Sequence, residues 1–340
     1  MTMTRRIFVT AAAAMALAAA GCSSGGGGSA ATRVNFGYIG DFNGTSLLAV
    51  AKEKGLWKKH GLDARTKVFT NGPLQIQALG TGDLDFGYIG PGAMWLPASG
   101  KAKVIAINTL GNADRVIAQP GITSLAALRG KTVGVPEGTS GDMILTLALQ
   151  SAGMTKKDVK IVPMDPSTIV SAFASKKIDA AGFWYPAIAT IKKRVPGLVE
   201  LAKNADFSAK VSFPTVFVAG NNVVAKERGK VEKVIAVLRE AMQFRSEHPD
   251  QTIEYTAKMI SAPPDQVRAD AANSKTLPVA ELDKDTRDGT IDKWLAGMND
   301  YFVQAGKLPS PVSPKSYYTG DLFTGSPDRP SSADLPGTAK

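Results

Sequence analysis

The sequence predicts an α/β protein in which two similar lobes are joined by a hinge that the chain crosses twice. Short strands rich in β-branched residues alternate with amphipathic helices, a pattern typical of parallel sheets with crossover helices. The hydrophobic fraction of 44% is enough to form a sizeable core. A stretch of the strand and helix pattern also occurs a second time, which predicts two lobes rather than one.

The repeat has a constant offset of 94 residues, seen where position 85 aligns with position 179. Residues 68–88 read VFTNGPLQIQALGTGDLDFGY and residues 162–182 read VPMDPSTIVSAFASKKIDAAG, and each predicts strand, turn, helix, strand. Upstream, a strand at 34–38 before a helix at 47–54 corresponds to a strand at 132–135 before a helix at 143–150. Asp85 and Asp179 begin equivalent strands in different lobes, so we expect structural roles rather than a catalytic carboxylate pair.

Two strand-like segments, 115–119 and 215–220, flank the second unit and locate the hinge. We expect the chain to leave lobe 1 near Asp114 and to return between 214 and 221. Lobe 1 is then 33–114 plus 221–310, and lobe 2 is 115–220. After the return, the spacing of apolar residues predicts one long helix and three further helices on lobe 1. The long helix carries Val231, Val234, Ile235, Leu238 and Met242, and the others span 252–260, 264–272 and 291–305. The Pro, Ser and Gly content of 311–340 predicts a loosely ordered tail.

The N-terminus has the pattern of an export signal over residues 1–21, with a basic start, an apolar run and a small-residue cleavage site. The apolar run, 7–20, is shorter than the ~20 residues that cross a bilayer. Residues 19–22 (AAGC) resemble a bacterial lipobox, which implies lipidation at Cys22 and leaves 22–32 as a lipidated cysteine and Gly-Ser tether. An ordinary cleavage site with a chance cysteine is the alternative. Residues 4–9 (TRRIFV) resemble a twin-arginine signal, and that route stays open. The expected location is the periplasm or the outer face of the cell membrane.

Composition argues against several other classes of protein. Cys22 is the only cysteine in the chain, so no intramolecular disulfide is expected. The formal charge is +10, but basic pairs such as 58–59, 156–157 and 192–193 are scattered, so we expect no nucleic-acid partner. His60 and His248 neighbour no plausible nucleophile, and the chain lacks a GxxxxGK[ST] phosphate loop and an HExxH helix. We therefore expect no enzyme activity, no cofactor and no metal.

Five segments carry a family resemblance over nearly the whole chain beyond the signal: GLWKKHGL (55–62), GDLDFG (82–87), LGNAD (110–114), LRGKTVGVP (128–136) and IDAAGFWYPA (178–187). They resemble solute-binding proteins for taurine and aliphatic sulfonates, with nitrate and thiamine-pyrimidine binders as more distant relatives. The resemblance implies a periplasmic-binding-protein fold, a small solute closed between the lobes, and ABC permease and ATPase partners. With the anchor expected at Cys22, the protein would be a monomeric, lipid-anchored receptor. A binder of another small anion or heterocycle, or the binding domain of a sensor or receptor, stays the alternative.

The solute is expected beyond the carboxyl ends of the strands, close to helix N-termini whose amides favour anions. Five turns lie in such places: 40–45, 70–73, 90–92, 137–142 and 184–186. Their candidate ligand-binding residues are Asp41, Asn43, Asn71, Gly72, Gly90, Pro91, Gly92, Glu137, Thr139, Ser140, Trp184 and Tyr185. Helix capping explains the hydroxyl residues equally well, and core packing explains each aromatic ring. In the repeat, Trp184 and Tyr185 align with Gly90 and Pro91, which predicts a cavity walled by large rings on one side.

Two further candidates concern selectivity. Asp114 lies at the predicted crossing, and the resemblance implies a carboxylate there that meets the amine of taurine, although a solvated hinge carboxylate is an equal alternative. Phe217 occupies the returning strand where the taurine pattern would have a second acidic residue. If Phe217 faces the cleft, an alkyl or aryl sulfonate is favoured over taurine itself.

Overall fold

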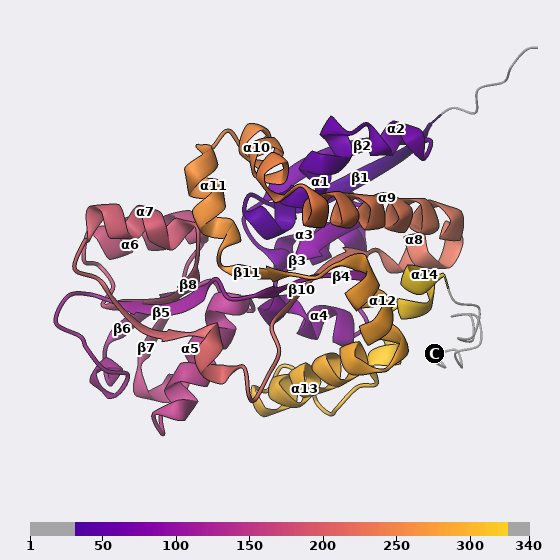
Figure 1. The fold of residues 1–340 in the computed structure, drawn as a ribbon. Helices are drawn as coiled ribbons and strands as arrows, with labels where there is room; N and C mark the ends of the chain where they lie inside the picture. The colour runs from indigo at the N-terminus through magenta and orange to yellow at the C-terminus, as the bar shows by residue number, and fades with distance from the viewer. Residues whose placement is uncertain (1–30, 326–340) are drawn as a thin grey trace, which may run out of the picture. The chain divides into compact units, whose positions relative to one another are not determined.

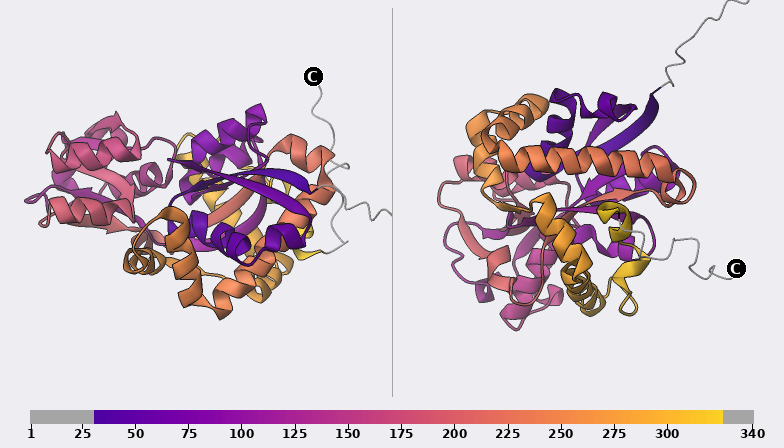
Figure 2. Two further views of the ribbon diagram at one scale, coloured as in Figure 1. Left: turned by 90° about the horizontal axis from the view of Figure 1, so that it is seen from above. Right: turned by 45° about the vertical axis from the view of Figure 1, so that its right-hand side comes forward.

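The computed structural model describes residues 31–325 (Figure 1). The predicted signal peptide, Cys22 and most of the tether lie outside these residues, as does the end of the predicted tail from 326 to 340. The described chain contains two sheets, each the centre of one lobe. In the left view of Figure 2 the magenta elements of the second lobe are grouped apart from the indigo, orange and yellow elements of the first.

The first sheet has six strands in the order β11-β4-β10-β3-β1-β2. Its strands are β1 (Thr32–Ile39), β2 (Leu62–Phe69), β3 (Phe86–Ile89), β4 (Lys103–Gly111), β10 (Pro214–Ala219) and β11 (Ser274–Thr276). The helices of this lobe are α1 (Phe42–Glu53), α2 (Leu56–Lys59), α3 (Gly72–Thr81), α4 (Trp95–Ala98), α8 (Asn221–Lys226), α9 (Arg228–Glu247), α10 (Pro249–Ile260), α11 (Pro264–Ala271), α12 (Val279–Arg287), α13 (Thr290–Gln304) and α14 (Gly320–Thr324), with the short η1 (Pro91–Ala93) and η5 (Pro314–Ser316).

The second sheet has five strands in the order β7-β6-β8-β5-β9. They are β5 (Asp114–Ala118), β6 (Thr132–Val135), β7 (Lys160–Pro163), β8 (Ala180–Trp184) and β9 (Val199–Lys203). The helices of this lobe are α5 (Ser140–Ser151), α6 (Pro166–Ala174) and α7 (Ala187–Arg194), with η2 (Ala126–Leu128), η3 (Lys156–Asp158) and η4 (Asn204–Phe207).

The predicted repeat is confirmed in the sheet topology. The parallel set β2-β1-β3 in the first sheet matches β7-β6-β8 in the second, and each set continues with an antiparallel strand, β10 or β5. Asp85 and Asp179 have the predicted structural role, because each carboxylate accepts from a backbone amide of the neighbouring parallel strand. The Oδ2 atom of Asp85 accepts from the Asn35 amide at 2.7 Å, and that of Asp179 from the Thr132 amide at 2.8 Å.

The return crossing lies earlier than predicted. β5 begins the second sheet at Asp114, as expected, but β10 (Pro214–Ala219) belongs to the first sheet and not to lobe 2. It is buried throughout and pairs antiparallel with both β3 and β4. The apolar pattern of 214–220 predicted a strand correctly, but pattern alone does not say which sheet a strand joins.

The helices after the return confirm most of the predictions. The five apolar residues predicted for the long helix all lie buried on α9, and α10, α11 and α13 match the three further helices. The prediction of a loose tail is wrong for residues 311–325. These residues form η5 and α14, where Tyr317, Tyr318 and Phe323 are buried and the Val104 amide donates to the Tyr317 carbonyl at 2.7 Å. Burial of the three aromatic rings orders this segment despite its Pro and Ser content.

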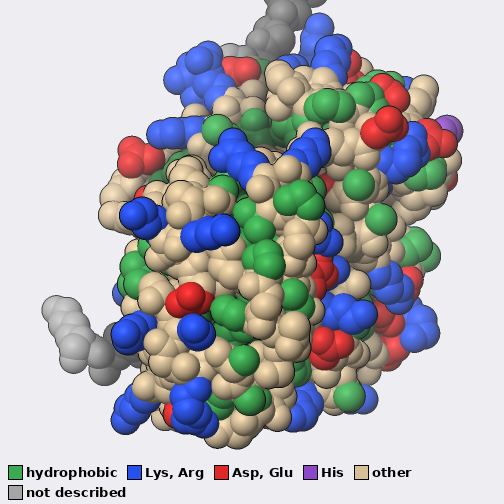
Figure 3. Space-filling model, turned by 90° about the vertical axis from the view of Figure 1, so that its left-hand side faces the viewer, with side chains coloured by type: hydrophobic (Ala, Val, Ile, Leu, Met, Phe, Trp, Pro, Cys, Tyr) green, Lys and Arg blue, Asp and Glu red, His purple; other side chains and the backbone are tan. Residues whose placement is uncertain are grey.

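The charged surface is mixed on the face drawn in Figure 3. Lys and Arg side chains are dispersed there, with acidic and hydrophobic side chains among them. Within residues 31–325 no helix is long and apolar enough to cross a membrane.

Candidate functional site

A cavity, which we call the inner cavity, lies between the two lobes at the carboxyl ends of the parallel strands. Most of the predicted site residues line it: Asp41, Asn43, Asn71, Gly72, Gly90, Pro91, Asp114, Thr139, Ser140, Trp184 and Tyr185. The volume open to the centre of a water molecule is about 40 Å³. One water needs roughly 10–15 Å³ on this measure, so the cavity has room for a small, compact group.

Three predicted site residues do not line the inner cavity. Gly92 instead forms a close contact between the lobes, since a Cβ atom built on it would lie 2.2 Å from the Thr139 carbonyl. The Glu137 side chain is 64% exposed, and its Oε1 atom lies 3.9 Å from Lys307 Nζ. Phe217 is fully buried, with its ring centroid 5.7 Å from that of Tyr88. Phe217 lies two residues further along β10 than Thr215, away from the cavity. Thr215 is therefore the residue of this strand that lines the cavity.

The lining also includes residues that were not predicted: Ile39, Tyr88, Ala93, Gly111, Ala113 and Thr215. Ile39 and Tyr88 lie at the ends of β1 and β3, where the rule that ligands lie beyond strand ends could have found them. Thr215 could not be found in this way, because its position depends on β10 joining the first sheet.

The lobe 1 wall of the cavity contains the N-terminus of α1, which two carboxylates cap. Asp41 is the N-cap residue, and its Oδ1 atom accepts from the Gly44 amide at 2.6 Å. The Oδ2 atom of Asp270, from α11, accepts from the Phe42 amide at 2.7 Å. Burial, and next the charge of Asp270, raise the pKa of Asp41 well above its usual range. Burial raises the pKa of Asp270 to about 6. The helix dipole favours both charges, but burial and mutual repulsion oppose them.

A third carboxylate lies at the hinge. Asp114 is buried, its amide donates to Asn204 Oδ1 at 2.7 Å, and its Oδ2 atom accepts from Asn204 Nδ2 at 2.8 Å. Burial raises the pKa of Asp114, while hydrogen bonds from Ser140 and Asn204 oppose that rise. The charge of Asp114 also raises the pKa of Asp41, so the two carboxylates interact across the cavity.

The lobe 2 wall contains the N-terminus of α5, which no side chain caps. Thr139 is the N-cap residue, but its hydroxyl donates to the Pro136 carbonyl at 2.6 Å instead of accepting from a first-turn amide. Asp142 in the first turn does not line the cavity, and its carboxylate pairs with Lys156. The positive end of α5 therefore faces the cavity with amides available for an anionic group.

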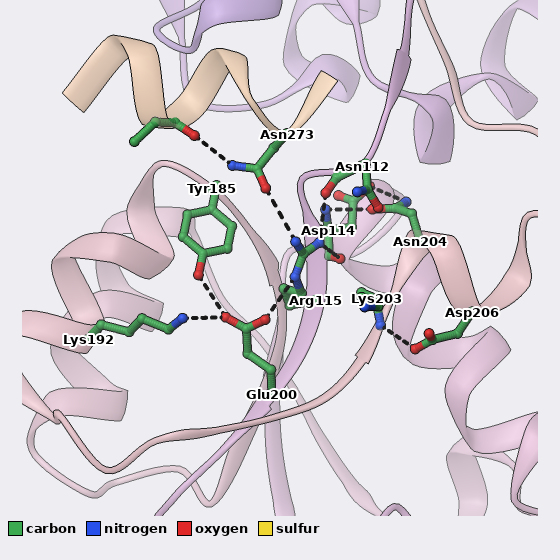
Figure 4. Close-up of polar contacts among 11 residues, drawn as sticks. Asn112, Asp114, Arg115, Tyr185, Lys192, Glu200, Lys203, Asn204, Asp206 and Asn273 are labelled. Atoms are coloured by element: carbon green, nitrogen blue, oxygen red, sulfur yellow. Dashed lines mark hydrogen bonds and ion pairs between the residues drawn. The ribbon is translucent and has the colours of Figure 1, made fainter. Parts of the chain in front are cut away.

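The Tyr185 ring on the same wall is fixed by a polar network shown in Figure 4. Its hydroxyl donates to Glu200 Oε1 at 2.7 Å, and Lys192 Nζ lies 2.6 Å from the same oxygen. Arg115 Nε donates to Glu200 Oε2 at 3.0 Å, and its Nη2 atom donates to Asn273 Oδ1 of lobe 1 at 3.3 Å. The network thus connects a cavity wall of lobe 2 to lobe 1.

The charged side chains among the described residues that line the cavity are Asp41 and Asp114. Both histidines are placed elsewhere: His60 Nε2 lies 2.7 Å from Glu240 Oε1, and the His248 ring packs on Phe244. Within residues 31–325 no cluster of His, Cys, Asp and Glu is suited to hold a metal. The cavity combines Asp41 on the lobe 1 wall, Asp114 at the hinge, and the α5 amides with the Trp184 and Tyr185 rings on the lobe 2 wall, which suits reversible binding of a small polar molecule.

Comparison with known sequences shows the family of this chain. A sequence profile described as NMT1/THI5 like matches residues 43–252. This chain belongs to the NMT1/THI5-like family. A Brucella abortus (strain 2308) protein, described only as a binding protein, is 59% identical over 86% of this chain and 91% of its own length. The taurine-binding periplasmic protein of Escherichia coli is 24% identical over 78% of this chain and 85% of its own length.

A solved structure confirms the predicted fold. The alkanesulfonate-binding protein SsuA from Xanthomonas axonopodis pv. citri, bound to MOPS, superimposes with a TM-score of 0.68 at 20% identity, covering 84% of this chain and 98% of that one. The chain therefore has the periplasmic-binding-protein fold, two α/β lobes with a double crossing between them.

Proposed function

We propose that this member of the NMT1/THI5-like family is the solute-binding protein of an ABC importer and that it captures a small sulfonate carrying an amine, such as taurine. The observation that carries the proposal is the electrical asymmetry of the inner cavity. Asp41 and Asp114 supply negative charge on the lobe 1 and hinge side, and the uncapped N-terminus of α5 supplies positive potential on the lobe 2 side.

The asymmetry favours a zwitterion over a simple anion. Nitrate or an alkanesulfonate without an amine would meet the α5 amides but leave the two buried carboxylates uncompensated or facing its own charge. An ammonium group placed between Asp41 and Asp114 would form charge-assisted hydrogen bonds with both. The names of the taurine and alkanesulfonate binders above support the sulfonate, and the carboxylates support the amine.

We infer that the solute leaves unchanged. No histidine lines the inner cavity among the described residues, and the carboxylates already serve as caps and hydrogen-bond acceptors. The solute recovered after denaturing a purified complex should be chemically identical to the one added. A product detected by mass spectrometry would instead show an enzyme.

Isothermal titration calorimetry of the protein lacking residues 1–21 tests the proposed solute. Taurine should bind at least about tenfold more tightly than ethanesulfonate, which has the same sulfonate end but no amine, since an ion pair in a desolvated site contributes this much or more. Nitrate should bind weakest. If ethanesulfonate binds as tightly as taurine, the carboxylates do not bind the amine of the solute. If no sulfonate binds, a thiamine-pyrimidine-type heterocycle or a different receptor role becomes the better explanation.

The anchor and the partners belong to the same proposal. Residues 1–21 direct export, Cys22 carries the lipid, and a monomer delivers the solute to the permease and ATPase subunits at the outer face of the cell membrane or in the periplasm. Mass spectrometry of membrane-extracted protein should find an acylated N-terminal Cys22, and Cys22→Ser should release the protein from the membrane fraction. An unmodified Cys22 would refute the anchor alone and leave the solute site untouched.

A further inference from the structure

Arg245 places a guanidinium in the core of lobe 1, and within the described chain no carboxylate pairs with it. The residue lies on α9 and is 2% exposed. Its Nη1 atom donates to Ser46 Oγ at 3.2 Å and to Asn108 Oδ1 at 2.8 Å, and its Nη2 atom donates to the Asn108 carbonyl at 3.2 Å. Burial lowers the pKa of Arg245 to about 10, so the group is charged at neutral pH. Because an apolar side chain of similar volume would avoid the cost of burying a charge, packing alone does not account for the guanidinium.

Asn108 connects Arg245 to the wall of the inner cavity. The guanidinium can only donate, so its bond to Asn108 Oδ1 fixes the orientation of this amide and leaves Nδ2 on the other side. That Nδ2 atom donates to the Asn43 carbonyl at 2.8 Å and to Thr215 Oγ1 at 3.4 Å. Asn43 and Thr215 both line the inner cavity, whereas Arg245 does not. Arg245 is thus two hydrogen bonds away from the cavity wall.

The hydroxyl groups beside Asn108 continue the hydrogen bonds in one direction. Thr109 Oγ1 donates to Asn43 Oδ1 at 3.1 Å. A hydroxyl has a single hydrogen, so Thr215 must be the donor in its 2.8 Å contact with Thr109. The donors therefore run from Arg245 through Asn108, Thr215 and Thr109 to Asn43. If the Asn108 amide were turned over, its nitrogen would face the guanidinium and its oxygen would face the Asn43 carbonyl.

The chain of hydrogen bonds ends on the two oxygens of Asn43. Its carbonyl accepts from Asn108 and its Oδ1 atom accepts from Thr109, while its Nδ2 atom donates to no other described residue. Because Asn43 lines the inner cavity, Nδ2 is the atom of this side chain that is left for a solute. A donor at this place requires an acceptor on the solute, and in taurine the acceptors are the three sulfonate oxygens.

We propose that Arg245 is a positioning residue, which acts through Asn108 to keep the amide nitrogen of Asn43 turned toward the solute. The inference rests on the proposed function, because that function supplies a sulfonate oxygen as the acceptor. Without the guanidinium, the Asn108 amide is free to turn, the hydroxyl bonds are free to reverse, and Asn43 is free to present Oδ1 instead. An oxygen there would repel the sulfonate. Arg245 therefore supports binding of the sulfonate without touching it.

A double-mutant cycle on taurine affinity, measured by calorimetry, tests this role. Arg245→Met removes the donors, and taurine affinity should fall at least about tenfold, the loss expected for one hydrogen bond to a charged group. Asn43→Ala should cause a similar loss. In the N43A background, R245M should cost nothing further, because no Asn43 amide is left to orient. Arg239→Met is the matched control: Arg239 lies on the same helix and pairs with Asp283 away from the cavity, so taurine affinity should be unchanged.

The outcomes separate this inference from the proposed function. If R245M binds taurine as tightly as the unaltered protein, or loses as much affinity in the N43A background as alone, the positioning role is refuted and the proposed function stands. An equal loss in R239M also refutes it, because the effect would then be one of general stability. If the unaltered protein binds no sulfonate, both are refuted.

Thermal unfolding shows whether each variant is folded. If R245M does not fold, Arg245→Lys takes its place in the cycle, because a single amine cannot donate to both oxygens of Asn108 in the geometry of the guanidinium. R245K should then lose about threefold in taurine affinity alone and nothing in the N43A background. Equal losses in the two backgrounds would refute the positioning role.

Discussion

The N-termini of α1 and α5 occupy equivalent places in the two repeats, but they are built in opposite ways. α1 is capped by Asp41 and Asp270, so carboxyl groups already occupy its positive end, and Asp41 of this pair lines the inner cavity. α5 has Thr139 as its N-cap residue and no side-chain cap, so its amides stay available. The same fold element thus supplies negative charge from one lobe and positive potential from the other. Two lobes of the same topology can therefore present opposite charge to a shared cavity when only the residues that cap their helices differ.

The largest expected effect comes from removing a carboxylate that faces the cavity. Asp114→Asn keeps the size of the side chain and a carbonyl oxygen for Asn204, but it removes the charge opposite the amine. Taurine affinity should fall at least about thirtyfold, the loss typical of truncating one partner of a buried charge pair. Ethanesulfonate affinity should stay the same or rise. Calorimetry of both solutes measures this, and an equal loss for both would mean that Asp114 matters for folding or closure only.

A substitution that prevents closure of the lobes should reduce solute affinity nearly as much. Gly92→Ala places a Cβ atom against the Thr139 carbonyl, where no side chain can yield, so the lobes cannot meet in the same way. We expect about a tenfold or greater loss of affinity for every solute, because closure no longer encloses the ligand. Small-angle scattering should show that the added solute no longer compacts the protein. Gly80→Ala in α3 is the control, since a Cβ atom there meets nothing within 4 Å, and equal behaviour of the two variants would contradict the closure role.

The paired caps of α1 predict a pH dependence of stability. The pKa of Asp270 is raised to about 6, so between its ordinary value near 4 and about 6 the folded state binds more protons than the unfolded state. The free energy of unfolding should therefore decrease as the pH rises through this window, because ionisation is more costly in the folded protein. Asp270→Asn should reduce the total fall in the free energy of unfolding across this window by on the order of 1 kcal/mol or more. Thermal unfolding without solute from about pH 4 to about pH 7 measures it, and a slope unchanged by D270N would be the contrary result.

The smallest effect should come from the network behind Tyr185. Glu200→Gln keeps one acceptor for the Tyr185 hydroxyl but weakens the contacts with Arg115 and Lys192. The ring should become less well positioned, and affinity should fall only about two- to fivefold, because the network is partly exposed. Glu232→Gln is a suitable control, since its pair with Arg228 lies on the surface. A loss larger than that of D114N would mean that the position of the ring matters more than the charge of Asp114.

The sequence predicts much of the fold because the repeat is local. Each strand-turn-helix-strand unit is encoded within about twenty neighbouring residues, and the ends of its strands locate most of the cavity. What sequence could not predict depends on distant pairing. The insertion of β10 between β3 and β4 buries Phe217 and brings Thr215 to the cavity, and Asp270 reaches α1 from a helix far along the chain.

The same limit explains the prediction about selectivity. Phe217 was the residue whose orientation would have favoured an alkyl or aryl sulfonate, and its burial beneath Tyr88 removes that argument. The turn at 40–45 predicts Asp41 as a site residue without a role for its charge. Only the structure shows that Asp41, Asp114 and Asp270 interact, because their separation in sequence hides it.

A crystal structure of the taurine complex is the most direct test of the central claim. The claim is that Asp41 and Asp114 bind the amine of a zwitterion and that the α5 amides bind its sulfonate. The predicted result has the amine within hydrogen-bond distance of Asp41 and Asp114, about 2.7–3.2 Å, and the sulfonate oxygens at the first amides of α5. A taurine bound in the opposite direction, with its sulfonate toward Asp41, or bound outside the inner cavity, would contradict the account.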